Sequence, residues 1–357
     1  MKKKFNIFLL IVFVLGLNLT GCKKTQEIKE NNIGDSVSQS KSDYLGLVMN
    51  SSGEYEGSLS QSSLRGLKKA EEELGFKVEY LESDTSDSYR TNIEYFTDCA
   101  LDMLFCAGYE MADDVEEFAS AHPDEHYAIL NYSFDENINN ILCIEFEDNQ
   151  VAFEAGYLAA YQTKTNRLGF LGSFRSEEMD AYEFGFKAGV ALAAKELGKE
   201  IFVEVDYIDS FDDEDLAKKD ADKLYDAGAD IIYHAVGKAS SGVIESARAH
   251  RTFVIGSEID QNNLAPEVFL ASTIRNVEDV VYNIAKEIKE AKQVSDVTGK
   301  TKFLGIKDGA VKIELSKNNM IPEELIKKLG EIEQAIIEDK IDSPYEETTY
   351  EEYIKNI

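Results

Sequence analysis

The sequence predicts an α/β protein of two doubly wound parallel-sheet lobes joined by a hinge. The main observation is a loose internal duplication, in which each half reads as strand, loop, helix, strand and then the same again. The strands are near-continuous apolar runs, as expected when both faces of a parallel sheet are buried. Right-handed crossovers would bring the carboxyl ends of all strands to one edge of each sheet, where ligands bind.

The head of the chain is typical of an exported protein. Three lysines precede an apolar run over residues 5–19, which is shorter than the roughly 20 apolar residues of a membrane-spanning helix. The run ends at LTGC (19–22), which resembles the lipobox of bacterial lipoproteins. We therefore expect residues 1–22 to be a lipoprotein signal peptide and Cys22 to be acylated, for example with palmitate. An ordinary signal peptide with an incidental cysteine is the alternative.

Such an anchor would hold the protein at the cell membrane, on its extracytoplasmic face. Residues 23–42 are polar and rich in Ser, Asn, Lys and Glu, so we expect a disordered tether there. The folded part would begin near Asp43 and is long enough for two lobes.

The composition argues against several classes of partner. The formal net charge is −31, with 68 acidic and 37 basic residues, so the surface repels phosphate backbones and a nucleic-acid partner is not expected. We interpret the spread acidic residues as a solvated surface; attraction of a cationic ligand is the less favoured alternative. Apart from Cys22, the cysteines (99, 106 and 143) and the four histidines show no metal-binding or disulfide spacing. No metal, cofactor or catalytic residue is assigned.

The repeated elements can be followed along the chain. In the first half, YLGLVMNSS (44–52) precedes the helical SLRGLKKAEEELG (63–75); in the second, RLGFLGSF (167–174) precedes YEFGFKAGVALAAKELG (182–198). The glycine that ends each helix suits a cap with positive φ. The continuations LDMLFCAG (101–108) and ADIIYHAVG (229–237) match as the next strand of each half.

The segments between the repeats suggest the lobe boundaries. The join lies near residues 146–150, and an amphipathic helix at 277–292 is expected to return to the first lobe. We assign 43–149 and about 275–297 to the first lobe, and 150–274 and about 298–357 to the second. This plan alone does not separate a binding protein from an enzyme.

Several segments carry a resemblance to a known family. They are SLSQSSLRGLKKAEEELG (58–75), FEDNQVAFEAGYLAA (146–160), YIDSFDD (207–213), LYDAGADIIYHAVGKASSGV (224–243), VIGSEIDQNNLAP (254–266) and LGIKDGAVKI (304–313). Their order resembles the basic membrane protein family of bacterial lipoproteins, purine-nucleoside receptors with a type I periplasmic binding fold. The resemblance implies a receptor that holds a nucleoside between its lobes and passes it to the membrane permease of an ABC-type importer.

The resemblance also implies the binding residues. The predicted ligand-binding set is Asn50, Tyr55, Tyr109, Asn131, Phe211, Gly237, Glu258 and Arg275. Phe211 and Gly237 keep the residues of the family, whereas Asn50 and Asn131 replace acidic residues, Glu258 replaces an aspartate and Arg275 a lysine. Leu59 stands where the family has an aromatic ring, so Tyr55 or Tyr109 would have to supply one. Glu258 and Arg275 together could still grip vicinal hydroxyls.

Other interpretations of these residues remain open. Asn50 and Asn131 are also common turn residues, Phe211 could belong to the core, and Tyr109, Glu258 and Arg275 could be surface residues. Two other functions compete with transport. A sensor or adaptor lipoprotein would bind a ligand without delivering it. A surface nucleoside hydrolase would need an aspartate cluster or an activated nucleophile, but the acidic stretch DDEDLAKKDAD (212–222) is typical of a solvated helix start.

Overall fold

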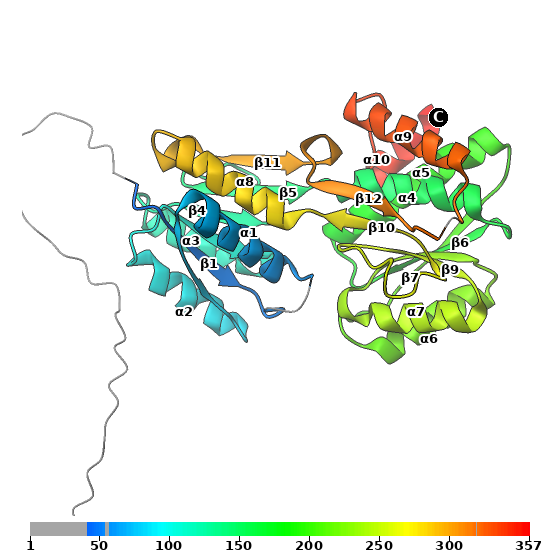
Figure 1. Ribbon diagram of the computed structural model, residues 1–357, viewed down its shortest axis with the longest axis horizontal. Coiled ribbons are helices and arrows are strands. Elements are labelled where there is room, and N and C mark those ends of the chain that lie inside the picture. The colour runs from blue at the N-terminus through cyan, green and yellow to red at the C-terminus, as the bar shows by residue number, and fades with distance from the viewer. Residues whose placement is uncertain (1–40, 54–56, 319) are drawn as a thin grey trace, which may run out of the picture.

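The computed structural model describes residues 41–53, 57–318 and 320–357, which form two α/β lobes side by side (Figure 1). The predicted fold class is confirmed: each lobe has helices on both faces of a six-stranded sheet that is wholly or mostly parallel. The signal peptide with Cys22, most of the tether and Tyr55 lie outside the described residues. Among the residues that the structure does describe, no helix has the length and apolar character needed to cross a bilayer.

The first lobe is built on a sheet in the order β11-β5-β4-β3-β1-β2, in which all neighbouring strands run parallel. Its elements are β1 (Tyr44–Met49), α1 (Leu59–Leu74), β2 (Lys77–Leu81), α2 (Ser86–Thr97), β3 (Met103–Ala107), the 3-10 turn η1 (Tyr109–Met111), α3 (Ala112–Ala121), β4 (Tyr127–Leu130), β5 (Ile141–Phe146), α8 (Val277–Glu290), η3 (Val294–Asp296) and β11 (Lys300–Leu304).

The second lobe repeats this plan on a sheet in the order β12-β10-β9-β8-β6-β7. Its elements are α4 (Asp148–Gln162), β6 (Arg167–Gly172), α5 (Glu177–Leu197), β7 (Phe202–Tyr207), α6 (Glu214–Asp226), β8 (Ile231–Ala235), η2 (Gly237–Ala239), α7 (Ser240–His250), β9 (Phe253–Gly256), β10 (Phe269–Arg275), η4 (Ile306–Asp308), β12 (Val311–Leu315), α9 (Glu323–Ile337) and α10 (Glu347–Asn356).

Burial on both faces explains the apolar strands. In β1, Leu45 and Leu47 belong to the core cluster that also includes Leu67 of α1, whereas Val48 belongs to the cluster on the other face, with Ile93 of α2. All of these side chains are fully buried. A strand in this position has no solvent-facing side, so a continuous apolar run replaces the alternation of a half-exposed strand.

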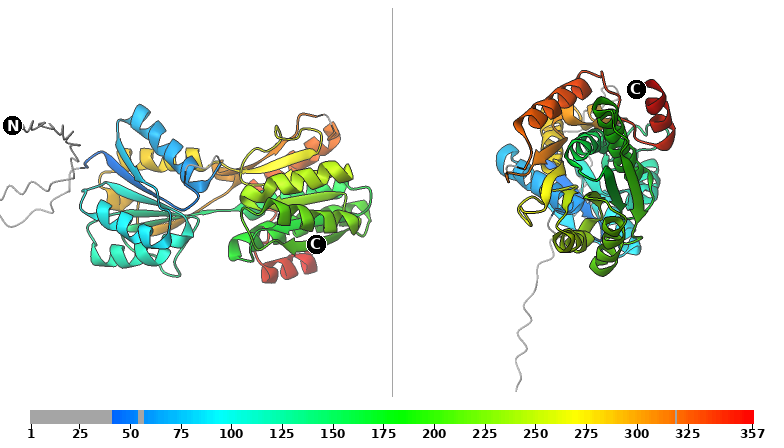
Figure 2. Two further views of the ribbon diagram at one scale, coloured as in Figure 1. Left: turned by 90° about the horizontal axis from the view of Figure 1, so that it is seen from below. Right: turned by 90° about the vertical axis from the view of Figure 1, so that its right-hand side faces the viewer.

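Three connections join the lobes: β5 to α4, β10 to α8, and β11 to β12. Figure 2 shows how narrow this junction is beside the lobes. The third connection corrects the predicted lobe boundary, because residues 300–304 pair with β5 in the first sheet although we assigned them to the second lobe. The same connection explains why β12 is antiparallel to β10. β10 runs toward the junction and ends there, whereas β12 starts at the junction and runs away from it.

The start of the folded part also differs slightly from the prediction. The backbone N–H of Ser42 donates to Asp102 at 2.7 Å, and the Nζ of Lys41 donates to the backbone oxygen of Ile288 at 2.7 Å. Residues 41 and 42 are therefore attached to the first lobe rather than belonging to the tether.

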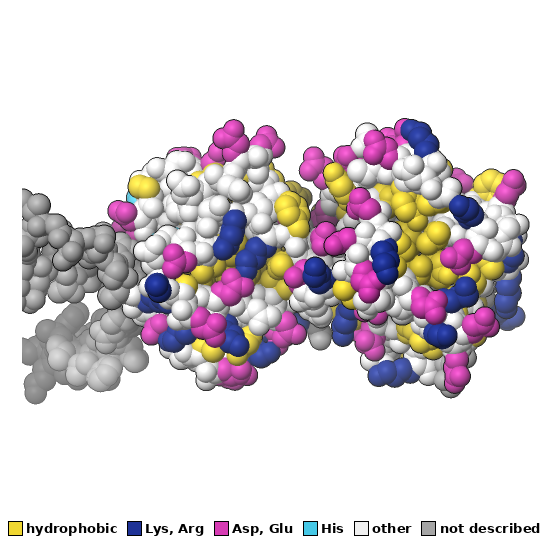
Figure 3. Space-filling model, turned by 90° about the horizontal axis from the view of Figure 1, so that it is seen from above, with side chains coloured by type: hydrophobic (Ala, Val, Ile, Leu, Met, Phe, Trp, Pro, Cys, Tyr) yellow, Lys and Arg dark blue, Asp and Glu magenta, His cyan; other side chains and the backbone are white. Residues whose placement is uncertain are grey.

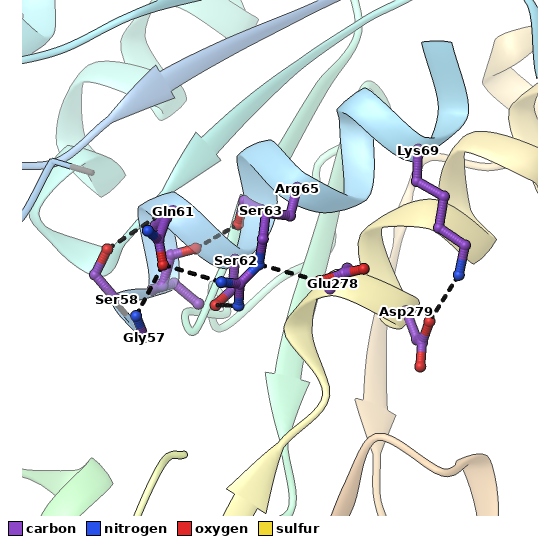
Figure 4. A network of polar contacts seen from close by, with 10 residues as sticks. Gly57, Ser58, Gln61, Ser62, Ser63, Arg65, Lys69, Glu278 and Asp279 are labelled. Atoms are coloured by element: carbon purple, nitrogen blue, oxygen red, sulfur yellow. Dashed lines mark hydrogen bonds and ion pairs between the residues drawn. The ribbon is translucent and has the colours of Figure 1, made fainter. Parts of the chain in front are cut away.

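The helix expected at 277–292 is α8, and it packs against α1 of the first lobe (Figure 4). The approach is close at Gly66, where a Cβ would lie 2.4 Å from the backbone oxygen of Glu278. The ion pairs Arg65–Glu278 and Lys69–Asp279, each 3.1 Å, flank this contact. Such exposed pairs contribute little, so backbone packing at the glycine holds the two helices together.

Candidate functional site

A cleft of about 570 Å³ lies between the lobes, at the carboxyl ends of the strands. The strand order of each lobe reverses between its first and third strands, that is between β1 and β3 and between β6 and β8. At such a point the two flanking helices lie on opposite faces of the sheet, which leaves a crevice for a ligand. Figure 3 shows the two lobes as separate masses that narrow where they meet. The volume suits a small metabolite.

The first-lobe wall of the cleft is polar. It is lined by Asn50, Ser51, Ser52, Gly57, Ser58, Leu59, Ser62, Gly108, Tyr109, Glu110 and Asn131. Hydrogen bonds fix the amide of Asn50: its Oδ1 accepts from the Oγ of Ser60 at 2.8 Å, and its Nδ2 donates to Glu110 at 3.2 Å. Ser58 caps α1 by accepting from the N–H of Gln61 at 3.0 Å. Hydrogen bonds within the first lobe thus orient Asn50 and the start of α1.

The second-lobe wall carries exposed aromatic rings. Phe174 follows β6, Phe211 follows β7, and their ring centroids are 4.9 Å apart. Phe211 is 50% exposed although it is a large apolar side chain. Gly237, with φ of +56°, lies beside it, and a Cβ there would be 3.3 Å from the backbone oxygen of Phe211. The rings are therefore held at the surface of the cleft rather than packed in the core.

A buried ion cluster lies where the two walls meet. The guanidinium of Arg275 is 2.6 Å from Asp148 and 2.7 Å from Glu178, and the hydroxyl of Tyr182 donates to Asp148 at 2.9 Å. The side chains of Arg275 and Asp148 are only 7% and 4% exposed. Burial alone would lower the pKa of Arg275, but the charge of Asp148 outweighs it, so the pKa is raised and the guanidinium stays charged.

This cluster changes the role expected for Arg275. The sequence paired it with Glu258 to hold hydroxyls, but its side chain instead binds Asp148 and Glu178, from the first turns of α4 and α5. Arg275 thus ties the end of a connecting strand to two helices of the second lobe. Its contact with Glu258 runs through the backbone, where its N–H donates to the oxygen of Glu258 at 3.0 Å.

Glu258 occupies an unusual position after β9. Its φ of +68° is uncommon for a residue with a long side chain, whereas Asn131, at the corresponding end of β4, has φ of +62° with a residue type that tolerates it. Glu258 is half-buried, and no ion pair to its carboxylate is formed within the described part of the chain. Burial raises its pKa to about 7, although the positive charge of Arg275 opposes the shift. A strained, unpaired carboxylate in a cleft indicates a functional position.

The structure brings together all the predicted site residues that it describes. Asn50, Tyr109, Asn131, Phe211, Gly237, Glu258 and Arg275 line the cleft, together with Leu59, while Tyr55 lies outside the described residues. Phe174, Glu178 and Glu110 also line the cleft but were not predicted from the sequence. Phe174 could have been found, because it follows its strand as Asn50 follows β1.

The arrangement is chemically suited to binding. It offers hydrogen-bonding groups on both sides, with the exposed rings of Phe174 and Phe211 on the second-lobe side and that of Tyr109 on the first-lobe side. Within the described ranges, no group of His, Cys, Asp or Glu side chains is placed to hold a metal ion. A small solute with a planar part and several hydrogen-bond donors would match both walls.

Comparisons with known proteins agree with this geometry. The sequence profile of a family described as "ABC transporter substrate-binding protein PnrA-like" matches residues 46–347. The chain is 34% identical to basic membrane protein A of Borreliella burgdorferi over 84% of this chain and 87% of that one. It is 32% identical to basic membrane protein B of Borrelia garinii subsp. bavariensis over 98% of both chains. An ABC transporter solute-binding protein from Aeropyrum pernix has a similar fold, with a TM-score of 0.74 at 20% identity, over 88% of this chain and 98% of that one.

Proposed function

The chain belongs to the Bmp family of PnrA-like ABC transporter substrate-binding proteins, and from this premise we propose that it binds a nucleoside or a closely related solute. The solute would lie in the cleft between the lobes and be delivered to the permease of an ABC-type importer. The family is one of substrate-binding proteins rather than of enzymes. We therefore expect reversible binding without turnover of the solute.

The observation that carries this proposal is the difference between the two walls. A nucleoside has a planar base and several hydroxyl groups, and the cleft places the rings of Phe174 and Phe211 opposite a wall of serine and asparagine side chains. Stacking of a base on an aromatic ring contributes about 1–3 kcal/mol. The hydroxyl groups would bond to side chains that other hydrogen bonds already orient.

A further aromatic ring is available on the first-lobe side of the cleft. Leu59 lines the cleft but cannot stack as an aromatic ring can, whereas Tyr109 is exposed in the cleft just after β3. Desolvation, together with the nearby charges of Glu110 and Glu178, raises the pKa of the Tyr109 hydroxyl, so the ring stays neutral. We propose that Tyr109 covers the face of the base that Phe211 does not.

The direct test is to identify what the protein carries. Mass spectrometry of small molecules released by denaturing freshly purified protein should detect a nucleoside. Calorimetry and thermal shift with inosine, guanosine, adenosine, uridine and glucose would follow. A bound ligand at a hundredfold excess over Kd should stabilise the fold by about 2.7 kcal/mol. Stabilisation by glucose alone, with no response to any nucleoside, would contradict the proposal.

We further propose that Cys22 carries the lipid anchor and that the protein faces outward from the cell membrane. The LTGC sequence at 19–22 supports this location. Cells grown with labelled palmitate should label the wild-type protein, and Cys22→Ser should abolish both the label and retention in the membrane fraction. Equal labelling of the two proteins would show that the cysteine is not the lipid site.

A further inference from the structure

Glu110 lies at the point of the first lobe where a ligand is expected. It belongs to η1, directly after β3, and the strand order reverses between β1 and β3. It lines the cleft beside Tyr109. Neither its position nor its type was singled out by the sequence pattern, since it is one of many acidic residues.

The backbone makes room for this carboxylate at Gly108. That residue has φ of +136°, a conformation that favours glycine. A Cβ at this position would lie 2.2 Å from Oε2 of Glu110 and 3.0 Å from Nδ2 of Asn50. The carboxylate therefore folds back over the glycine, and any other residue at this position would displace it.

Asn50 holds the carboxylate in this place. Its Nδ2 donates to Oε1 of Glu110 at 3.2 Å, while its Oδ1 accepts from Ser60 and Ser52, so the amide cannot turn away without losing those bonds. Each carboxylate oxygen can accept more than one hydrogen bond, so Glu110 keeps capacity for a further donor. Partial desolvation in the cleft raises the pKa of Glu110, while its side chain remains exposed and open to a ligand.

We propose that Glu110 is the ligand-contacting acceptor of the first lobe, positioned by Asn50 and Gly108, and that it selects solutes with a hydrogen-bond donor at that end. This inference rests on the proposed function. The opposite wall adds further carboxylates to the same cleft: Glu178, Asp209, Asp212 and Glu258. They outnumber its cationic lining residues, Lys238 and Arg275, and the guanidinium of Arg275 is engaged by Asp148 and Glu178. A phosphorylated solute would meet carboxylates there, so neutral or cationic donors are favoured over anions.

Protein variants and ligand analogues are combined in one thermodynamic cycle of binding affinities. Wild type, Glu110→Gln and the control Glu116→Gln, an exposed residue of α3 outside the cleft, are titrated by calorimetry. The probes are inosine and four analogues that each lack one donor: 1-methylinosine, 2′-deoxyinosine, 3′-deoxyinosine and 5′-deoxyinosine. Because a hydrogen bond to a charged group contributes about 1.5–3 kcal/mol, Glu110→Gln should weaken inosine binding by about tenfold or more. Glu116→Gln should not change it.

The analogues separate direct contact from a structural role. One analogue should bind wild type about tenfold more weakly than inosine, yet bind Glu110→Gln no more weakly than inosine does. In that variant the single amide oxygen accepts from Asn50, so the NH2 group faces the ligand and cannot accept from its donor. Equal loss for every analogue in both proteins, or inosine binding by Glu110→Gln within about twofold of wild type, would overturn the inference. If wild type binds no nucleoside at all, the proposed function fails and the inference fails with it. If wild type binds inosine but Glu110→Gln does not show the expected loss of affinity, only the inference about Glu110 fails and the proposed function stands.

Discussion

The two lobes share one backbone plan but present different side chains to the cleft. After the third strand of each sheet comes a glycine with positive φ: Gly108 makes room for the carboxylate of Glu110, whereas Gly237 lies against Phe211. The corresponding glycine therefore lies against a carboxylate in one lobe and against an aromatic ring in the other. The comparison shows that the duplicated fold decides where the binding loops lie, and that a few side chains in those loops decide what they bind.

The ends of the fourth strands show the same relation. Asn131 after β4 and Glu258 after β9 have nearly equal φ, +62° and +68°, so the duplicated backbone turns in the same way. The first-lobe residue is neutral, and the second-lobe residue is a carboxylate with a raised pKa. Substitutions at the junction and at the cleft residues of the second lobe would break or sharpen this comparison between the lobes.

The largest effect is expected at the junction. Arg275→Met would leave Asp148 buried without its partner, which costs about 3–5 kcal/mol of unfolding free energy. Urea unfolding of the ligand-free protein measures this. The control is Arg90→Met, since Arg90 forms an exposed pair with Glu117 at 2.6 Å. That change should cost about 1 kcal/mol or less. Equal losses in the two variants would show that the buried cluster does not stabilise the second lobe beside the junction.

The aromatic wall is tested next by affinity. Phe211→Ala should weaken inosine binding by about 1–3 kcal/mol, because the base would lose its stacking partner. Phe202→Ala is the matched control, since Phe202 is a 59% exposed phenylalanine of the same lobe outside the cleft. Calorimetry should show a large change for the first variant and none for the second. If the two variants bind inosine equally well, the second-lobe rings do not contact the ligand.

A smaller effect distinguishes the glycine that contacts the cleft from a glycine that only caps a helix. Gly237→Ala and Gly198→Ala should each cost about 1–2 kcal/mol of stability, because alanine disfavours positive φ. Their φ angles are similar, +56° and +62°, but no atom lies within 4 Å of a Cβ at Gly198. Only Gly237→Ala should also weaken inosine binding, by moving Phe211. Matching affinities in the two variants would remove the proposed support for that ring.

The smallest effect is a pH dependence from Glu258, because its side chain is partly exposed and solvent screens its interactions. Its raised pKa, about 7 against an ordinary value of 4.5, means that the folded protein keeps a proton that the unfolded chain releases. The free energy of unfolding that this group contributes is therefore lost as pH rises from 4.5 to about 7, and the loss is complete above the pKa of the folded protein. Glu258→Gln has no such proton, so its melting temperature minus that of wild type should increase between about pH 5 and about pH 8. If the melting temperatures of the two proteins change with pH in parallel, Glu258 lies in a more solvated environment and its pKa is not raised.

Much of this division could be predicted from the sequence. The apolar runs and their duplication predicted two doubly wound lobes, and the family resemblance predicted Asn50, Asn131, Phe211 and Glu258 as binding residues, which line the cleft. The expectation failed where side chains meet residues distant in the chain. Asp148, which engages Arg275, is 127 positions away from it.

The misplaced strand and the missed acceptor have similar causes. The segment KTKFL (300–304) has too few apolar residues to be recognised as part of a buried sheet, because it forms the edge of the sheet. Glu110 depends on the room at Gly108 and on the amide of Asn50, which only the folded backbone brings together. No local pattern distinguishes it from the other acidic residues.

Hydrogen exchange with and without inosine tests the central claim most directly. If one ligand is held between two unlike walls, the loops that follow β1 and β3 should slow their exchange together with the loops that follow β6, β7 and β8. Protection in both lobes at the same ligand concentration is the predicted result. Protection confined to one lobe, or located away from the strand ends, would contradict binding between the lobes.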